Sequence, residues 1–168
     1  MALIDNRGQV IEDLWSYPDP GTIGTVRANC VTLLDTLSLR DCEFPLERPI
    51  GVYASAGTTA DRIAPVLGEL DLVVVEFPKF RDGRGFTLAR TLRGKHGFKG
   101  DIRAIGHVLP DQFPALVQCG FSSIVLPADH PPEQWIQSGA AAVRHAGGPL
   151  LQRLLSARSA PAAHREKT

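Results

Sequence analysis

The chain lacks both an excess of charge and a long apolar run. Its 168 residues carry 18 Lys and Arg against 18 Asp and Glu, so the formal net charge is zero. Polyanions such as nucleic acid or an anionic membrane surface do not attract a neutral protein, and we expect neither as a partner. No apolar run approaches the roughly 20 residues of a membrane-spanning helix, and the first residues do not resemble a secretory signal. We therefore expect a cytoplasmic protein.

Cysteine is scarce, and the usual motifs for metals and cofactors are missing. The three cysteines, Cys30, Cys42 and Cys119, are far apart and form no Cys-x-x-Cys pair. An odd number in a reducing compartment argues against disulfides, and three are too few for a four-cysteine iron–sulfur cluster. The histidines show no metal-ligand spacing, and there is no Walker loop, Rossmann glycine motif or serine elbow. We predict no metal site, and the residues alone define neither a cofactor nor an enzymatic activity.

Strand and helix patterns alternate over most of the chain. We predict strands at Ile50–Ala54, Leu72–Phe77, Ile102–Gly106 and Ser123–Leu126, and helices near Asp61–Leu70, Arg84–His96, Asp111–Cys119 and Pro132–Ala146. This alternation predicts an α/β fold with a mostly parallel sheet of about four β/α units. The nearly continuous apolar run at 72–77 indicates a strand buried on both faces. Four units cannot close an eight-stranded barrel, so the alternative is a half-barrel that dimerises.

A β-hairpin is predicted ahead of this core. Residues 2–5 and 9–14 flank a turn at residues 6–8, and a further strand at Cys30–Leu33 is followed by a short helix. We interpret residues 1–156 as one α/β domain, with the hairpin at 1–20 and the β/α core at 49–147. Residues 157–168 are too small and polar to pack, which predicts a disordered tail. Exposed edges of such a sheet would favour a homo-oligomer.

The turn that follows Leu72–Phe77 is the first candidate site, with five residues that we single out: Lys79, Asp82, Gly83, Arg84 and Gly85. Parallel α/β proteins usually place ligands where a buried strand ends in a glycine-rich turn and opens a helix. In the favoured interpretation Asp82 caps the following helix by accepting backbone N–H bonds. In a compatible second interpretation, free N–H groups and the basic side chains around them bind a small anion.

Two further arginines stand in apolar surroundings. Arg93 falls inside the apolar arc of its predicted helix, where an unpaired guanidinium is costly. We favour a structural pair with an acid such as Asp82, Asp101 or Glu76 over a role in a cleft shared with Arg103. Arg103 lies inside a strand pattern, on the same face as Asp101. A solvated edge would explain it, whereas a central strand would require a partner for its charge.

The segment after this strand adds three polar candidates, His107, Asp111 and Gln112. They lie where the carboxyl ends of parallel strands gather functional groups. A histidine there can act as an acid or a base, although ordinary loop histidines are more common. Cys119 ends a helix beside apolar neighbours, which predicts a buried and unreactive thiol.

Several ordered blocks together resemble one family. The blocks are Phe77-Pro78-Lys79-Phe80, Asp82-Gly83-Arg84-Gly85-Phe86, Ala89-Arg90-x-Leu92-Arg93, Gly100-Asp101-Ile102-Arg103-Ala104-Ile105-Gly106, Leu109-x-Asp111-Gln112 and Cys119-Gly120-Phe121. Over about residues 49–126 the chain resembles a proteobacterial family, a domain of unknown function, that is encoded beside sirohaem sulfite reductase. Its members are described as probable oxidoreductases of sulfite reduction. The resemblance implies a connection with sulfur assimilation but no mechanism.

Residues and resemblance together give two hypotheses. In the first, the protein is an accessory protein that docks on sulfite reductase or its electron donor, with the cationic turn as contact surface. This would account for the missing cofactor motifs. In the second, it is a small oxidoreductase or anion-binding module that holds sulfite, or a phosphate-bearing cofactor such as a flavin, at residues 79–85. We favour the first.

Overall fold

The computed structural model describes residues 2–17, 28–38 and 48–145. Within these residues seven strands form one sheet, in the order β2-β1-β7-β6-β5-β4-β3. The strands are β1 (Leu3–Asp5), β2 (Val10–Ile11), β3 (Cys30–Leu33), β4 (Ile50–Ala54), β5 (Leu72–Phe77), β6 (Asp101–Gly106) and β7 (Ser123–Val125). The α-helices are α1 (Leu34–Ser38), α2 (Ala60–Ile63), α3 (Arg84–Gly94), α4 (Phe113–Cys119) and α5 (Pro132–His145), with 3-10 helices η1 (Ala64–Glu69) and η2 (Pro110–Gln112).

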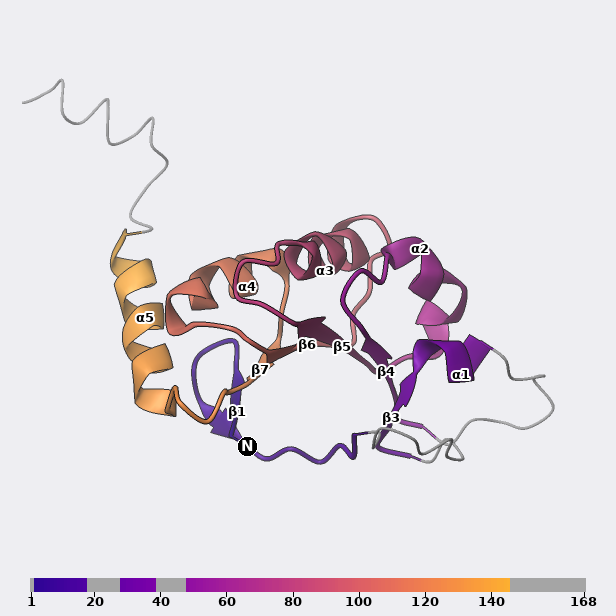
Figure 1. Ribbon diagram of the computed structural model, residues 1–168, viewed down its shortest axis with the longest axis horizontal. Helices are drawn as coiled ribbons and strands as arrows, with labels where there is room; N and C mark the ends of the chain where they lie inside the picture. Colours follow the sequence, from indigo (N-terminus) through magenta and orange to yellow (C-terminus); the bar gives the residue numbers. More distant parts are fainter. Residues whose placement is uncertain (1, 18–27, 39–47, 146–168) are drawn as a thin grey trace, which may run out of the picture.

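The sheet is mostly parallel and singly wound, with successive strands added at the same side. Strands β3 to β7 lie side by side in chain order and pair in parallel. The hairpin of β1 and β2 extends the sheet as an antiparallel edge, because β1 pairs with β7. Figure 1 shows a curved sheet with α2, α3 and α4 on its convex side. The predicted α/β fold with a parallel sheet and an N-terminal hairpin is confirmed.

Strand β5 is buried on both faces, as its apolar run predicts. Val73, Val75 and Phe77 belong to the main core beneath the helices. Leu72 and Val74 alternate with them and belong to a second apolar cluster on the concave face. Because successive side chains of a strand point to opposite faces, a continuous apolar run is what a doubly covered strand requires.

Proline alters one predicted helix. The pattern at 61–70 predicts a helix that Pro65 shortens or delays; in the structure α2 ends at Ile63 and the chain continues as the 3-10 helix η1, with Pro65 in its first turn. Proline has no N–H to donate and its ring crowds the preceding turn, so an α-helix does not continue through it. Helix α4 ends as the sequence predicts, because Gly120 takes a φ of 99° and the N–H of Phe121 bonds to the carbonyl oxygen of Leu116.

Residues 12–17, which we call the crossing segment, run over the concave face of the sheet (Figure 1). The hairpin was predicted to reach residue 14, but β2 ends at Ile11 because the chain leaves it to cross the sheet. At the far side Ser16 bonds to Asn29 and Val31, on the outer edge of β3. The ring of Trp15 lies 3.0 Å from where a Cβ on Gly51 would be, so it packs closely against the backbone of β4. The chain therefore covers its own concave face.

Some predictions fall outside the described residues. Cys42, residues 18–20 of the predicted hairpin region and the predicted tail at 157–168 are among them. Within the described ranges, none of the helices has the length and apolar character needed to cross a bilayer.

Candidate functional site

The turn between β5 and α3 presents an exposed aromatic ring between two cations. Phe80 is 46% exposed, and the guanidinium carbon of Arg81 lies 5.2 Å from the centroid of its ring. Lys79 is also exposed. Among the ion pairs formed by the described residues, none involves Lys79 or Arg81. We call these three residues the basic–aromatic turn.

The basic–aromatic turn is tied to the neighbouring loop by Gln112. The side-chain amide of Gln112 donates to the carbonyl oxygen of Phe80 at 2.7 Å. Its Oε1 accepts the backbone N–H of Leu109 at 3.0 Å, which fixes the side chain from the other end. Within the turn, the N–H of Asp82 bonds to the carbonyl oxygen of Lys79 at 3.0 Å. The exposed side chains therefore stand on a backbone that is held at both ends.

The carboxylate of Asp82 bonds to the first residue of α3. It accepts the backbone N–H of Arg84 at 3.1 Å, and also bonds to the Nε and Nη2 of the Arg84 side chain at 2.9 and 2.6 Å. The predicted backbone N–H bond to Asp82 is present, but the N-cap residue of α3 is Gly83, so Asp82 lies one residue before the cap position. Gly85 has a packing role, since a Cβ there would lie 2.6 Å from the ring of Phe77. Gly83 lies at the N-cap of α3 in an ordinary right-handed conformation.

Asp82 gives a measurable signature of this contact. Its hydrogen bonds with the Arg84 side chain and backbone lower the pKa of Asp82 from 3.8 to about 2. Because the pKa is lower in the folded state, the contact stabilises the fold above pH 3.8 and is lost as the pH falls towards 2. In a carboxylate NMR titration we expect a midpoint near 2 for Asp82, and a midpoint closer to 3.8 in Arg84→Gln. An unchanged midpoint in the folded variant would contradict the assignment.

Arg84 also lines a groove between α2 and α3. The groove has a volume of about 320 Å³ and includes Thr58 and Lys95. The charge of Lys95 is balanced by Asp61 at 3.3 Å, as that of Arg84 is balanced by Asp82. The two basic side chains of the groove therefore contribute little net positive charge to it.

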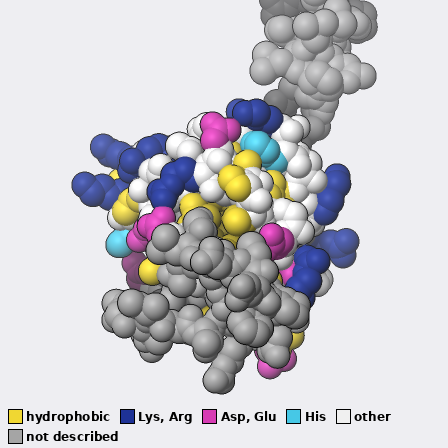
Figure 2. Space-filling view, turned by 90° about the vertical axis from the view of Figure 1, so that its right-hand side faces the viewer, with side chains coloured by type: hydrophobic (Ala, Val, Ile, Leu, Met, Phe, Trp, Pro, Cys, Tyr) yellow, Lys and Arg dark blue, Asp and Glu magenta, His cyan; other side chains and the backbone are white. Residues whose placement is uncertain are grey.

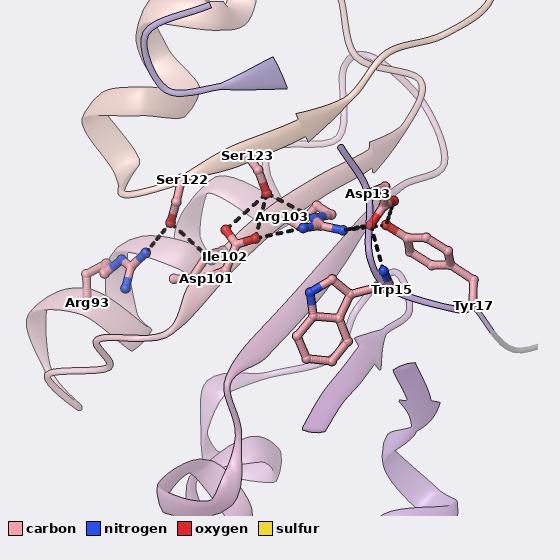
Figure 3. A network of polar contacts seen from close by, with 9 residues as sticks. All are labelled: Asp13, Trp15, Tyr17, Arg93, Asp101, Ile102, Arg103, Ser122 and Ser123. Atoms are coloured by element: carbon pink, nitrogen blue, oxygen red, sulfur yellow. Dashed lines mark hydrogen bonds and ion pairs between the residues drawn. The ribbon is translucent and has the colours of Figure 1, made fainter. Parts of the chain in front are cut away.

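Arg103 lies on the central strand β6 and is bonded through all three of its nitrogen atoms (Figure 3). Its side chain is only 4% exposed. Nε donates to Ser123 at 2.9 Å, Nη2 to Asp101 at 3.0 Å, and Nη1 to both Asp13 at 2.7 Å and Tyr17 at 2.8 Å. The predicted partner of a central arginine is thus a pair of carboxylates, one of which comes from the crossing segment.

Tyr17 remains a neutral hydroxyl in this network. Burial raises its pKa to about 12, so it donates to Asp13 at 2.8 Å while accepting from Arg103. Burial disfavours the charge on Arg103, but the hydrogen bond with Tyr17 and the charges of Asp101 and Asp13 outweigh it and raise the pKa of Arg103. A charged Arg103 therefore fastens the crossing segment to the sheet.

Arg93 holds loops together at the amino edge of the sheet, opposite the basic–aromatic turn. Nη1 donates to the carbonyl oxygens of Phe98 and Gly100, both at 2.7 Å, and Nε to that of Gly120 at 2.9 Å. Nη2 donates to the hydroxyl of Ser122 at 2.7 Å (Figure 3). The predicted pair with an acid is wrong, because the hydrogen-bond partners of Arg93 are neutral oxygens. Arg93 therefore holds these loops without an ion pair to a described residue. The periodicity of the helix could not predict these partners, because the carbonyl groups belong to loops outside it.

The structure divides the predicted site residues into three places. One group lies at the carboxyl edge of the sheet: Lys79, Asp82, Gly83, Arg84 and Gly85, together with Asp111 and Gln112 in the next loop. Arg93 lies at the amino edge, and Arg103 on the concave face. His107 is exposed, and its backbone N–H donates to the carbonyl oxygen of Phe77.

The sequence interpretation missed the exposure of Phe80 and the anchoring role of Gln112. An aromatic residue between two cations in a polar turn was the available signal for Phe80. Cys119 is buried, as predicted, and its sulfur accepts a hydrogen bond from Arg90. Within the described ranges, no three His, Cys, Asp or Glu side chains gather closely enough to hold a metal ion.

Charge is mixed on the surface that carries α1 and α2. Figure 2 shows Lys and Arg side chains at the top and on both flanks of this face, with carboxylates between them. This pattern agrees with the balanced composition of the chain.

Fold and site together define a small α/β protein with a singly wound, mostly parallel sheet and an exposed basic–aromatic turn at its carboxyl edge. Residues 51–145 match a family of bacterial proteins of unknown function, DUF934. The match spans more than half of the chain, and the protein belongs to this family. No curated protein matches the chain.

Proposed function

We propose that the protein is an accessory protein of sulfur assimilation that docks on sulfite reductase or its electron donor through the basic–aromatic turn. The observation that carries the docking role is the exposed Phe80 ring between Lys79 and Arg81. The connection with sulfite reduction rests on the resemblance of the sequence blocks at residues 77–121.

The composition of the turn suits a docking surface. Aromatic and arginine side chains dominate the binding energy of many protein interfaces. Basic groups around them steer an acidic partner and fix its orientation. Because Gln112 already holds the backbone at Phe80, little chain entropy is lost when the turn binds.

Docking is better supported than the binding of a small anion at residues 79–85. The N–H of Arg84 and two nitrogens of its side chain already bond to Asp82. An incoming sulfite or phosphate would have to displace this carboxylate. Lys79 and Arg81, by contrast, have no ion pair with a described residue and are open to a partner.

The test measures affinity for purified sulfite reductase and for its electron donor by calorimetry at low and high salt. We expect Phe80→Ala to weaken the complex by about tenfold, as for a central interface aromatic. The double variant Lys79→Glu/Arg81→Glu should weaken it further and flatten its dependence on salt.

Arg7→Glu is the matched control, because Arg7 is an exposed cation on the β1–β2 turn. We expect it to leave the affinity unchanged. Equal affinities for the wild type and both turn variants, or no complex with either protein, would refute the proposal.

A further inference from the structure

A second hollow lies at the amino edge of the sheet, opposite the basic–aromatic turn. It has a volume of about 660 Å³ and lies between η1 and the loop that joins α3 to β6. Its apolar lining comes from Leu67, Leu70 and Phe98, each no more than 9% exposed. Small-molecule sites commonly have volumes of about 300–1,000 Å³. We call this space the amino-edge hollow.

One polar atom in the lining of this hollow has no partner. The Nε2 atom of His96 is buried and makes no hydrogen bond with any described residue. A buried polar atom without a hydrogen bond costs free energy, and such atoms are uncommon in folded proteins. An imidazole nitrogen can accept or donate, depending on its tautomer. If the His96 ring turns toward the hollow, a polar group of a ligand there would satisfy it.

The wall of the hollow is held rigidly. Arg93 bonds to the carbonyl oxygens of Phe98 and Gly100, and its guanidinium carbon lies 5.7 Å from the centroid of the Phe98 ring. Gly100 allows no side chain, because a Cβ would lie 2.5 Å from the carbonyl oxygen of Asp71. The loop is thus fixed before any ligand arrives, which lowers the entropy cost of binding.

Basic groups stand at the rim. Lys99 is exposed and forms no ion pair with the described residues. Arg48 bonds to Asp71 through Nε and Nη2, yet its side chain remains 58% exposed. Its guanidinium can still meet a second anion, since arginine offers five donors in a planar fork.

We propose that the amino-edge hollow binds a planar ring that carries a phosphate group, a ligand of the mononucleotide class. The apolar lining around Phe98 takes the ring, Lys99 and Arg48 take the phosphate, and Nε2 of His96 bonds to a polar atom of the ligand. This site is separate from the basic–aromatic turn, at the other edge of the sheet. Its ligand and a docked partner can therefore be present together.

The experiment titrates the full chain with adenosine monophosphate and with flavin mononucleotide, by calorimetry and by NMR of the His96 ring. We expect saturable binding of at least one probe and a shift of the His96 ring signals. Lys99→Glu should weaken that binding by about tenfold, because the rim charge is reversed. His96→Phe keeps a ring but removes Nε2, and should weaken it about three- to tenfold.

Arg7→Glu is the control here too and should bind like the wild type. Inorganic phosphate and the two dephosphorylated compounds separate the contributions of the phosphate and of the ring. Failure of both probes to saturate at about 10 mM would overturn the proposal. Binding that leaves the His96 ring signals of the wild type unmoved, or that Lys99→Glu does not weaken, would also overturn it. None of these outcomes depends on the docking test.

Discussion

Arg103→Met is expected to lower the free energy of unfolding by about 3 kcal/mol. The substitution leaves Asp13 and Asp101 without the charge that now lies 2.7 and 3.0 Å from them. Removing one partner of a buried ion pair costs about 3–5 kcal/mol, and the lower end applies because both carboxylates are about a quarter exposed. Urea unfolding measures the change, and hydrogen exchange of residues 12–17 shows whether the crossing segment has loosened.

The matched control is Arg62→Met, which removes an arginine from an exposed ion pair. Arg62 and Asp35 have side chains that are 57% and 78% exposed, so the pair contributes about 0–1 kcal/mol. If both variants lost the same stability, or if Arg103→Met left exchange in the crossing segment unchanged, Arg103 would not be what fastens that segment.

Arg93→Met is expected to destabilise the protein by about 2–4 kcal/mol, measured by the same unfolding experiment. Methionine keeps much of the apolar stem but cannot donate to the three carbonyl oxygens and the Ser122 hydroxyl that Arg93 now serves. Partly buried acceptors that lose their donors retain the cost of desolvation. Protection of the amides at residues 98–100 should fall along with global stability.

Arg90→Met provides the comparison within the same helix. Arg90 is exposed, and it donates a 3.5 Å hydrogen bond to the sulfur of Cys119. We expect a change within about 0.5 kcal/mol, as for most surface substitutions. A loss in Arg90→Met as large as that in Arg93→Met would show that the helix surface, rather than the carbonyl contacts, accounts for the effect.

The parts of the fold that the sequence predicted are those encoded locally. Strands β4 and β5 have the predicted bounds, because each is an apolar run that ends at turn residues. The helix predicted at 61–70 was only partly right, since Pro65 divides it into two helix types. The path of residues 12–17 was missed, because nothing in their pattern shows which face of the sheet they cover.

The same contrast holds for the site. The hydrogen bond from the N–H of Arg84 to Asp82 joins residues two positions apart, and the sequence predicts it. The partners of Arg103 in the crossing segment lie 86 and 90 positions away, so no local pattern reveals them. The partners of Arg93 are carbonyl groups, which every residue possesses and no sequence motif marks. Only the structure could therefore reveal the distant partners of Arg103 and the backbone acceptors of Arg93.

The crossing segment has a consequence for the limits of the folding unit. The family match begins at residue 51, whereas Asp13, Trp15 and Tyr17 all precede it. A fragment cut to the matched stretch would lack β1, β2 and β3. It would also lack Trp15 and Tyr17, so the concave face of the sheet would be exposed, and Arg103 would lose its bond to Asp13. The stretch that matches the family model is therefore shorter than the sheet and the contacts that cover it, and we expect a fragment of residues 51–145 to be less stable than the full chain.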